Sequence, residues 1–243
     1  MSKMNKFRKL DKQSDGLSSI SDLMSGLMII FLFISVAFMS KVADENISIK
    51  KQQEAVENIV EAYEETKLNI YNDLYLEFEE DMKTWNMEIE KDGTIRFKEP
   101  DVYFETGEAE LKNEFKGILD EFFPRYIELV YKNHKDNVKE IRIEGHTSSE
   151  WEGSLNKKDS YFENMELSQD RTRNVLKYVM TMNEIQKYED WLIYNITANG
   201  MSYSKRIIND DNTENKEASR RVEFKVITNS EETINEVLDN YND

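Results

Sequence analysis

The chain has 243 residues and a formal net charge of −17, with 49 acidic against 32 basic side chains, two histidines and no cysteine. Without cysteine there is no thiol nucleophile, disulfide scaffold, zinc–cysteine site or iron–sulfur cluster, and two histidines do not provide for a histidine-rich metal centre. The negative charge repels phosphate backbones and disfavours direct binding of nucleic acid.

The N-terminal segment predicts a membrane anchor. Residues 1–15 carry a net charge of +3 and leave −20 for the rest of the chain. Leu23 to Met39 is a run of 17 residues without a charge, and extension back to Leu17 makes 23 residues. At ~1.5 Å per residue this gives about 34 Å of helix, enough to cross a hydrocarbon core of about 30 Å. We expect a cytoplasmic basic head at residues 1–16, a transmembrane helix at 17–40 and the remainder in the bacterial periplasm.

Two features of this anchor have alternative interpretations. A cleavable signal peptide is the alternative to an anchor, but the apolar run is long and no small-x-small cleavage site follows Met39. Asp22 is the only ionisable residue in the 23-residue run. It is either a helix N-cap at the water boundary or a carboxylate inside the helix that faces a partner helix and binds H+ or Na+.

Residues 41–92 predict a periplasmic connector helix. Residues 41–90 contain neither Pro nor Gly, and an apolar or aromatic residue recurs every seventh position at Val42, Ile49, Val56, Tyr63 and Ile70. This stripe fits a parallel dimer of the chain with its own copy, or one amphipathic helix lying on the domain that follows. Lys91-Asp92-Gly93 then predicts a turn.

Residues 93–230 predict a two-layer α+β domain with the order β-α-β-α-β-β. Strands are indicated by alternating polarity and helices by a 3.6-residue period. The expected strands are 94–97, 138–145, 191–198 and 221–228, with a short extended piece at 102–104, and the expected helices are 111–132 and 167–182. Pro124 predicts a kink or break of the first helix at Phe123. Residues 231–243 form a C-terminal tail.

A long polar connection at 147–166 is a candidate functional loop. Ser168 near the expected start of the second helix, with Arg171 in its first turn, would place a guanidinium beside free backbone N–H groups. That arrangement favours a bound carboxylate. The alternative is an ion pair of Arg171 with Asp170 or Glu166 on a solvated face.

Five sequence blocks within residues 94–228 resemble the OmpA-like peptidoglycan-binding domain. They are YFETGEAEL at 103–111, IEGHT at 143–147, NxxLSxxR at 164–171, Asn199-Gly200 and ASRRVE at 218–223. The resemblance implies a pocket that holds the carboxylates and amine of diaminopimelate in the cell-wall stem peptide. Carried over by position, Arg171 meets a carboxylate, and the other pocket residues are Thr147, Ser148, Asn164, Leu167 and Ser168.

The chain departs from this family at one position. The family usually has Asp directly after Gly-His-Thr, where this chain has Ser148. The change removes a partner for the ammonium group of the ligand. Glu150, Glu152 and Asp159 are candidates to replace it.

The segment ISDLMSGLMIIFL at residues 20–32 resembles the single span of MotB-type stator subunits, whose membrane aspartate carries the translocated ion. Within that class, residues 145–150 and 167–172 most resemble the ZorB family, the stator-like subunits of the Zorya anti-phage defence system. The resemblance implies a homodimer inside a ring of a multi-span MotA/ZorA-like subunit, with H+ or Na+ as the coupling ion through Asp22 and no other cofactor or metal.

These resemblances indicate an ion-driven motor component in phage defence that is anchored to peptidoglycan. The alternatives are a flagellar MotB-type stator subunit and a passive peptidoglycan-binding tether of the envelope. An enzyme is not expected, because His146 beside Thr147 and Ser148 has no acid–base partner at a meaningful spacing. No catalytic residue is predicted.

Overall fold

The computed structural model describes residues 2–98, 100–151, 153–154 and 156–229, and it describes side chains for these residues except 2–19, 100 and 101. The predicted tail at 231–243 lies outside this range. The chain divides into two units, whose described parts are residues 2–57 and residues 58–229.

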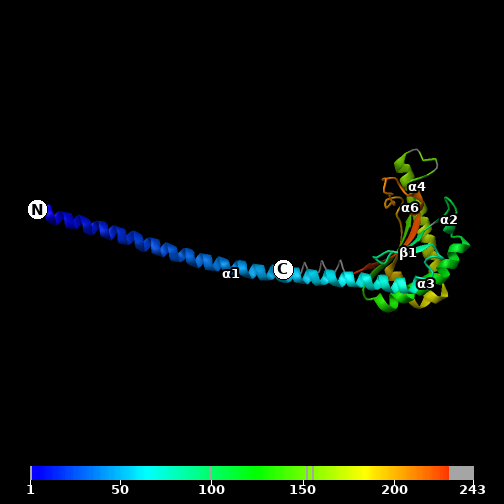
Figure 1. Ribbon diagram of the computed structural model, residues 1–243, viewed down its shortest axis with the longest axis horizontal. Helices are drawn as coiled ribbons and strands as arrows, with labels where there is room; N and C mark the ends of the chain where they lie inside the picture. The colour runs from blue at the N-terminus through cyan, green and yellow to red at the C-terminus, as the bar shows by residue number, and fades with distance from the viewer. Residues whose placement is uncertain (1, 99, 152, 155, 230–243) are drawn as a thin grey trace. The chain divides into compact units, whose positions relative to one another are not determined.

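The structure contains one long helix, five strands and several shorter helices (Figure 1). In chain order the elements are α1 (Ser2–Phe78), β1 (Met87–Ile89), β2 (Ile95–Lys98), α2 (Pro100–Tyr103), α3 (Asn113–His134), β3 (Val138–His146), α4 (Lys157–Val179), η1 (Asn183–Tyr188, a 3₁₀ helix), α5 (Glu189–Asn195), β4 (Ile196–Gly200), α6 (Lys216–Ser219) and β5 (Arg221–Thr228). The α+β class predicted from the sequence is confirmed.

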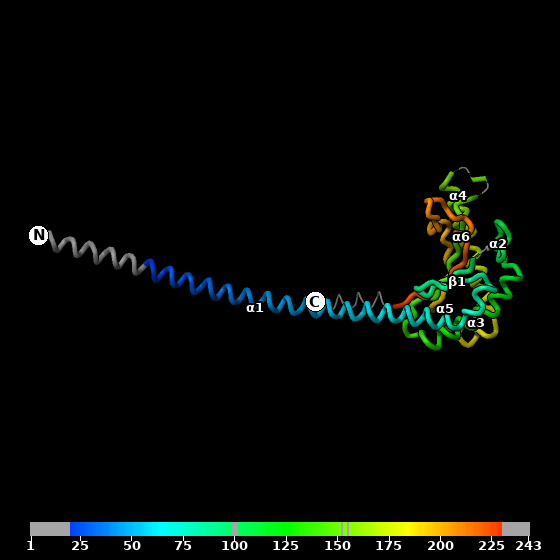
Figure 2. The backbone as a smooth tube through the Cα atoms, viewed as in Figure 1, coloured from blue at the N-terminus to red at the C-terminus, as the bar shows by residue number. Residues whose placement is uncertain are grey.

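The first unit consists of the N-terminal part of α1, which Figure 2 traces from residue 20 onward. All side chains from Ile20 to Ser40 are exposed in this chain, and an 18-residue window of this helix has a mean hydropathy of 2.3. Among the residues whose side chains are described, α1 alone is long and apolar enough to cross a membrane, by length and composition. An exposed apolar surface of this kind is what a lipid environment accommodates.

The C-terminal end of α1 belongs to the core of the second unit. Ile70, Leu74 and Phe78 recur every four residues on one helix face and are completely or almost completely buried. Arg125 of α3 donates from Nε to Glu77 Oε1 over 2.7 Å and from Nη1 to Asp81 Oδ2 over 2.8 Å. The seventh-residue stripe therefore packs on the domain at Ile70, whereas the dimer expected for the connector helix stays a prediction.

The predicted extent of the connector helix, to residue 92, is wrong. The helix ends at Phe78, whose carbonyl accepts from the N–H groups of Asp81 and Met82, and turns follow up to Asn86. Met87–Ile89 is a strand because its alternate residues are buried against the core. The predicted turn at Gly93 exists, at φ +80°, but it closes the β1–β2 hairpin.

The five strands form one mixed sheet in the order β1-β2-β5-β3-β4. β3 and β4 are parallel, with Gly145 opposite Gly200, and the other neighbours are antiparallel. One face carries apolar side chains that join those of the helices in a single core, with Phe122 of α3 in ring contact with Phe97 of β2 and Phe224 of β5. The opposite face carries paired charges, so the domain has two layers, as predicted.

Three predicted elements need correction. α3 continues through Pro124 without a break, because the loss of one N–H donor is offset by the burial of neighbours such as Phe122, Phe123 and Tyr126. In the extended piece predicted at 102–104, residues 102 and 103 belong to the helical turn α2, and only Phe104 pairs in a β-bridge, with Leu111. Residues 191–195, predicted as strand, belong to α5, whose Ile193 and Tyr194 point to solvent, and β4 starts only at Ile196.

We predict that Gly200→Ala destabilises the domain and that Gly117→Ala does not. A Cβ at Gly200 would lie 2.4 Å from the backbone nitrogen of Gln169, so α4 would have to move away from β4. Overpacking of this kind costs about 1–3 kcal/mol. A Cβ at Gly117 meets nothing within 4 Å on α3, where alanine is the better helix former by roughly 0.5–1 kcal/mol.

The measurement is denaturant unfolding of the full chain in detergent micelles, followed by tryptophan fluorescence. All three tryptophans, at positions 85, 151 and 191, lie in the second unit, so the signal reports on the domain. Equal stability of the Gly200→Ala variant and the parent would contradict the close approach of α4 to β4.

Candidate functional site

The main pocket of the domain lies where β3 and β4 end. Since the two strands are parallel, the segments that follow them leave the sheet at the same edge. Backbone bonds join these segments, from Met201 N to Gly145 O over 2.8 Å and from Thr147 N to Ser202 O over 2.9 Å. The first half of α4 forms another wall.

The pocket has a volume of about 1010 Å³. It is lined by polar, basic and aromatic side chains from four segments of the chain. They are Thr106, Gly107, Thr147, Ser148, Ser149, Glu150, Trp151, Ser154, Asn156, Lys157, Ser160, Asn164, Leu167, Arg171, Tyr203, Arg206 and Arg220. Five of the six predicted peptidoglycan-binding residues are in this lining, and Ser168 is not.

α4 begins ten residues earlier than predicted. Asn156 is the N-cap, and its side-chain oxygen accepts from the N–H groups of Lys158 and Asp159. The helix was missed because its buried face is polar up to Arg171, through Ser160, Asn164 and Ser168, so residues 157–166 have no apolar period. Arg171 is therefore not beside free N–H groups in a first turn, and that part of the carboxylate argument is wrong.

Arg171 is held by the loop that precedes α3. Its Nε donates to the carbonyl of Glu108 over 2.8 Å and its Nη2 to that of Glu105 over 3.2 Å. The guanidinium carbon lies 4.8 Å from the ring centre of Phe104. Of the two acids in the alternative interpretation, Asp170 and Glu166, Asp170 forms an ion pair with Arg173 over 2.8 Å. The guanidinium of Arg171 is thus fixed at the pocket wall, and the residue as a whole is 8% exposed.

The remaining predicted residues have different roles. Asn164 is buried and donates to the carbonyls of Ser160 and Glu150, which ties the 147–151 segment to α4. Thr147 and Ser148 are both buried in the pocket floor. Ser168 lies behind the lining, where its Oγ donates to the carbonyl of Met165 and accepts from Ser202 N. Its position indicates a structural role.

Basic residues that the sequence did not single out also line the pocket. Arg206 precedes α6, Arg220 lies inside the ASRRVE block, and Lys157 is the first residue of α4. The position of Arg220 in a family block was a usable signal, whereas nothing in the sequence around Arg206 marks it. Tyr203 adds an aromatic surface, and the guanidinium of Arg206 lies 5.5 Å from its ring centre.

The candidates for a replacement acid are mostly engaged elsewhere. Glu150 lines the pocket and forms an ion pair with Lys216. Asp159 accepts from the side chain of Asn156 over 2.8 Å and does not line the pocket. Glu152 lies outside the described residues.

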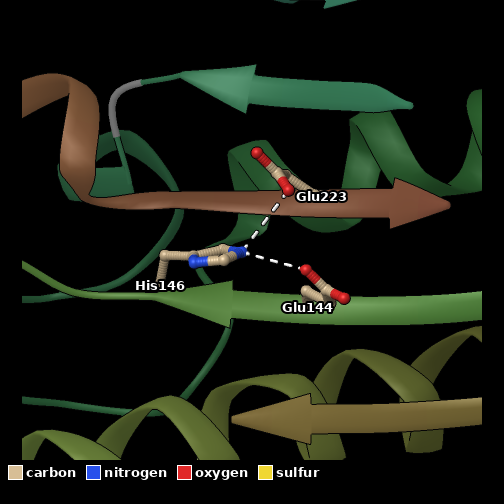
Figure 3. Close-up of side chains that lie close together, drawn as sticks. All are labelled: Glu144, His146 and Glu223. Atoms are coloured by element: carbon tan, nitrogen blue, oxygen red, sulfur yellow. Dashed lines mark ion pairs between the residues drawn. The ribbon is translucent and has the colours of Figure 1, made fainter. Parts of the chain in front are cut away.

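A second cluster of ionisable groups lies on the face of the sheet opposite the apolar core. The imidazole Nε2 of His146 on β3 is 3.3 Å from Glu144 Oε2 and 3.4 Å from Glu223 Oε2 (Figure 3). All three residues are buried, and the imidazole does not make a hydrogen bond with proper angles to either carboxylate. Four cations surround the two acids, namely Arg96, Arg142, Arg221 and Lys225.

These cations determine the protonation of the acids and argue against a metal. Burial alone would raise the pKa of Glu144, but His146 and Lys225 outweigh it and lower the pKa to about 2. The same opposition, with Arg221 and Lys225 beside the carboxylate, holds the pKa of Glu223 well below its usual range. Because the positive side chains already pair with both acids, a divalent ion would have to displace them.

Asp22 lies within a continuous helix. α1 starts at Ser2, so Asp22 has helical backbone on both sides and is not an N-cap, which excludes that interpretation. One turn further along, Ser25 Oγ donates to the carbonyl of Ser21 over 2.8 Å. Asp22 is exposed in this chain, as are its neighbours in the apolar run.

We predict that acidification weakens the domain through Glu144 and Glu223. Both have a lower pKa in the folded chain than the usual 4.5, so their ionised forms stabilise the fold above about pH 4.5. This contribution decreases as the pH falls from 4.5 toward 2. At pH 7, Glu223→Gln should cost roughly 3–5 kcal/mol, since it leaves buried cations without their partner.

Denaturant unfolding at pH 7 and pH 3.5 measures both effects. Glu128→Gln is the matched control, because Glu128 pairs with Lys132 at the surface and its loss should leave the unfolding free energy nearly unchanged. If Glu223→Gln resembled this control, the charge network would not stabilise the sheet.

Comparisons with known proteins agree with this architecture. Residues 103–221 match the OmpA family. Over 231 residues the chain is 43% identical to the Zorya protein ZorB of Escherichia coli (strain Crooks), and the match covers 95% of each chain.

Solved structures with related folds are more distant. A MotB-like protein from Desulfovibrio vulgaris is 21% identical, with 70% of this chain and 93% of that chain covered and a TM-score of 0.44. The cell wall anchor of the T6SS from Pseudomonas aeruginosa is 18% identical, with 64% and 96% covered and a TM-score of 0.42. The near full-length identity decides the classification: the chain belongs to the ZorB family and carries an OmpA-family domain.

Proposed function

We propose that the chain is the stator-like subunit of an ion-driven motor complex in Zorya-type anti-phage defence. In this proposal Asp22 carries H+ or Na+ through the membrane and the OmpA-family domain holds the complex to peptidoglycan. The observation that carries the proposal is the 43% identity to a Zorya protein over 95% of both chains. The matched region includes the apolar helix as well as the domain.

Asp22 has the chemistry that ion coupling needs. An ionised carboxylate within a bilayer costs several kcal/mol unless it is paired or neutralised. Binding of a proton or Na+ neutralises it, and its release restores the charge. Alternation between these states changes which contacts with a surrounding membrane subunit are favourable. One span cannot build an ion path alone, so the proposal requires a homodimer within a ring of a MotA/ZorA-like subunit.

The domain has the chemistry that an anchor needs. The pocket contains a fixed guanidinium, Arg171, and further cations at its rim, which attract the carboxylates of cell-wall peptides. The basic head at residues 1–15 favours a cytoplasmic N-terminus, which sends the domain to the periplasm of a single-pass inner-membrane protein. Anchored domains would keep the dimer still while the ring turns.

We predict that Asp22→Asn abolishes phage protection and ion flux while the protein remains in the membrane. The amide keeps the size of the side chain and removes the group that binds the ion. Asp44→Asn is the matched control, because Asp44 is an acid of the same helix that lies beyond the apolar run. Plating efficiency of phage and the membrane fraction of the chain are the measurements. Protection that survives in Asp22→Asn would favour a passive tether.

We predict that Arg171→Ala lowers binding of the full chain to purified cell-wall sacculi at least tenfold. Arg171 also supports the loop at residues 105–108, so loss of binding could follow from a loosened loop. Asn174→Ala tests this, because Asn174 donates to the carbonyl of Ala109 in the same region without lining the pocket. Equal loss in both variants would contradict a direct role of Arg171.

A further inference from the structure

The net charge of the pocket lining is opposite in sign to the net charge of the chain. The protein carries a net charge of −17, yet within the described part of the pocket lining the cations are Lys157, Arg171, Arg206 and Arg220, against Glu150 as the acid. A local excess of positive charge in so acidic a chain favours an anionic ligand and disfavours a cationic one.

The acids near the pocket are already paired. Glu150 forms its ion pair with Lys216, which lies outside the lining. Glu214 lies behind the pocket, where its carboxylate accepts from Ser149 N over 2.9 Å and from Ser149 Oγ, and it is 3.8 Å from Nη1 of Arg206. Both carboxylates are thus already engaged with other groups of the chain.

The floor of the pocket contains a polar group that a ligand can satisfy. The hydroxyl of Thr147 is buried, at an exposed fraction of 4% for the residue, and has no hydrogen-bond partner in the described part of the chain. Buried hydroxyl groups are normally hydrogen-bonded. Ser148 follows it in the lining with a neutral side chain. The side chains of Thr147 and Ser148 thus offer hydrogen bonds and carry no negative charge.

We propose that the pocket recognises the carboxylates of its cell-wall ligand and gains nothing from a free amine. Its preferred ligand is a diaminopimelate unit whose side-chain amine is acylated, as in cross-linked peptide stems. An acylated amine removes an ammonium that the surrounding cations repel and leaves the carboxylates unchanged. The inference rests on the proposed anchoring to peptidoglycan and specifies which form of the peptide stem the pocket binds.

The test is titration calorimetry of the full chain in detergent micelles with three probes. They are meso-diaminopimelate, its mono-N-acetyl derivative and its monoamide, in which one carboxylate is neutralised. We expect the N-acetyl probe to bind more tightly than meso-diaminopimelate, and the monoamide to bind at least tenfold more weakly than meso-diaminopimelate. Binding of meso-diaminopimelate that is as tight as or tighter than that of the N-acetyl probe would overturn the inference.

Substitution of Ser148 tests the electrostatic argument directly. Ser148→Asp places a carboxylate in the pocket floor and should reverse the preference toward the free amine, whereas Ser148→Asn, of similar size and neutral, should keep the parent preference. Reversal in both variants, or in neither, would contradict the electrostatic argument. Tryptophan fluorescence verifies that each variant is folded. The comparison of the three probes on the parent chain does not depend on the variants.

A parallel sedimentation assay with purified sacculi separates this inference from the anchoring itself. If the chain binds sacculi but prefers the free amine, the inference is wrong and the anchoring stands. If the chain binds neither sacculi nor any probe, both are wrong.

Discussion

The domain depends on a constraint of its two-layer architecture, in which helices cover only one face of the sheet. The other face is built from charges that pair across strands, and its central members Glu144, His146 and Glu223 are buried. Glu223 on β5 is the centre of this network, since its carboxylate accepts from Arg96 on β2 and from Arg221 on its own strand. Lys225 continues the network to Glu144 on β3. These pairs require one register, because a slip of one residue would turn the charges into the core.

The pocket follows from the same sheet. Parallel pairing of β3 and β4 delivers two loops to one edge, and Gly145 and Gly200 allow α4 to approach the strand ends closely. At Gly145 a Cβ would lie 2.8 Å from the carbonyl of Ser168. The first half of α4 therefore lies against polar loops instead of an apolar sheet, and its buried residues are polar. Because these buried residues are polar, the sequence has no apolar period that would indicate where α4 begins.

The sequence predicted what depends on long periodic runs and on local chemistry. The apolar helix, the α+β class, the strands near 94–97, 138–145 and 221–228 and the turn at Gly93 all appear in the structure. The family blocks placed five lining residues together, although their binding roles stay predictions.

The errors occurred where tertiary contacts override local preference. Residues 79–90 are rich in helix-forming residues, but burial of Trp85, Met87 and Ile89 draws them into turns and a strand. Residues 191–195 read as a strand because they are aromatic and β-branched, but only Leu192 among them is fully buried. Arg206 reaches the pocket from a loop more than fifty residues after β3, a juxtaposition that only the folded chain reveals.

The polar stripe of α4 has a consequence for the dynamics of the domain. Contacts such as Asn164 to the carbonyl of Glu150 and Ser160 Oγ to that of Ser149 hold its first turns, and little apolar area is buried there. Local opening costs least in such regions, so backbone amides of these turns should exchange with solvent faster than those near Val175 and Val179. A ligand that bridges loop and helix would slow this exchange. The anchor would then be stiffest when it is occupied.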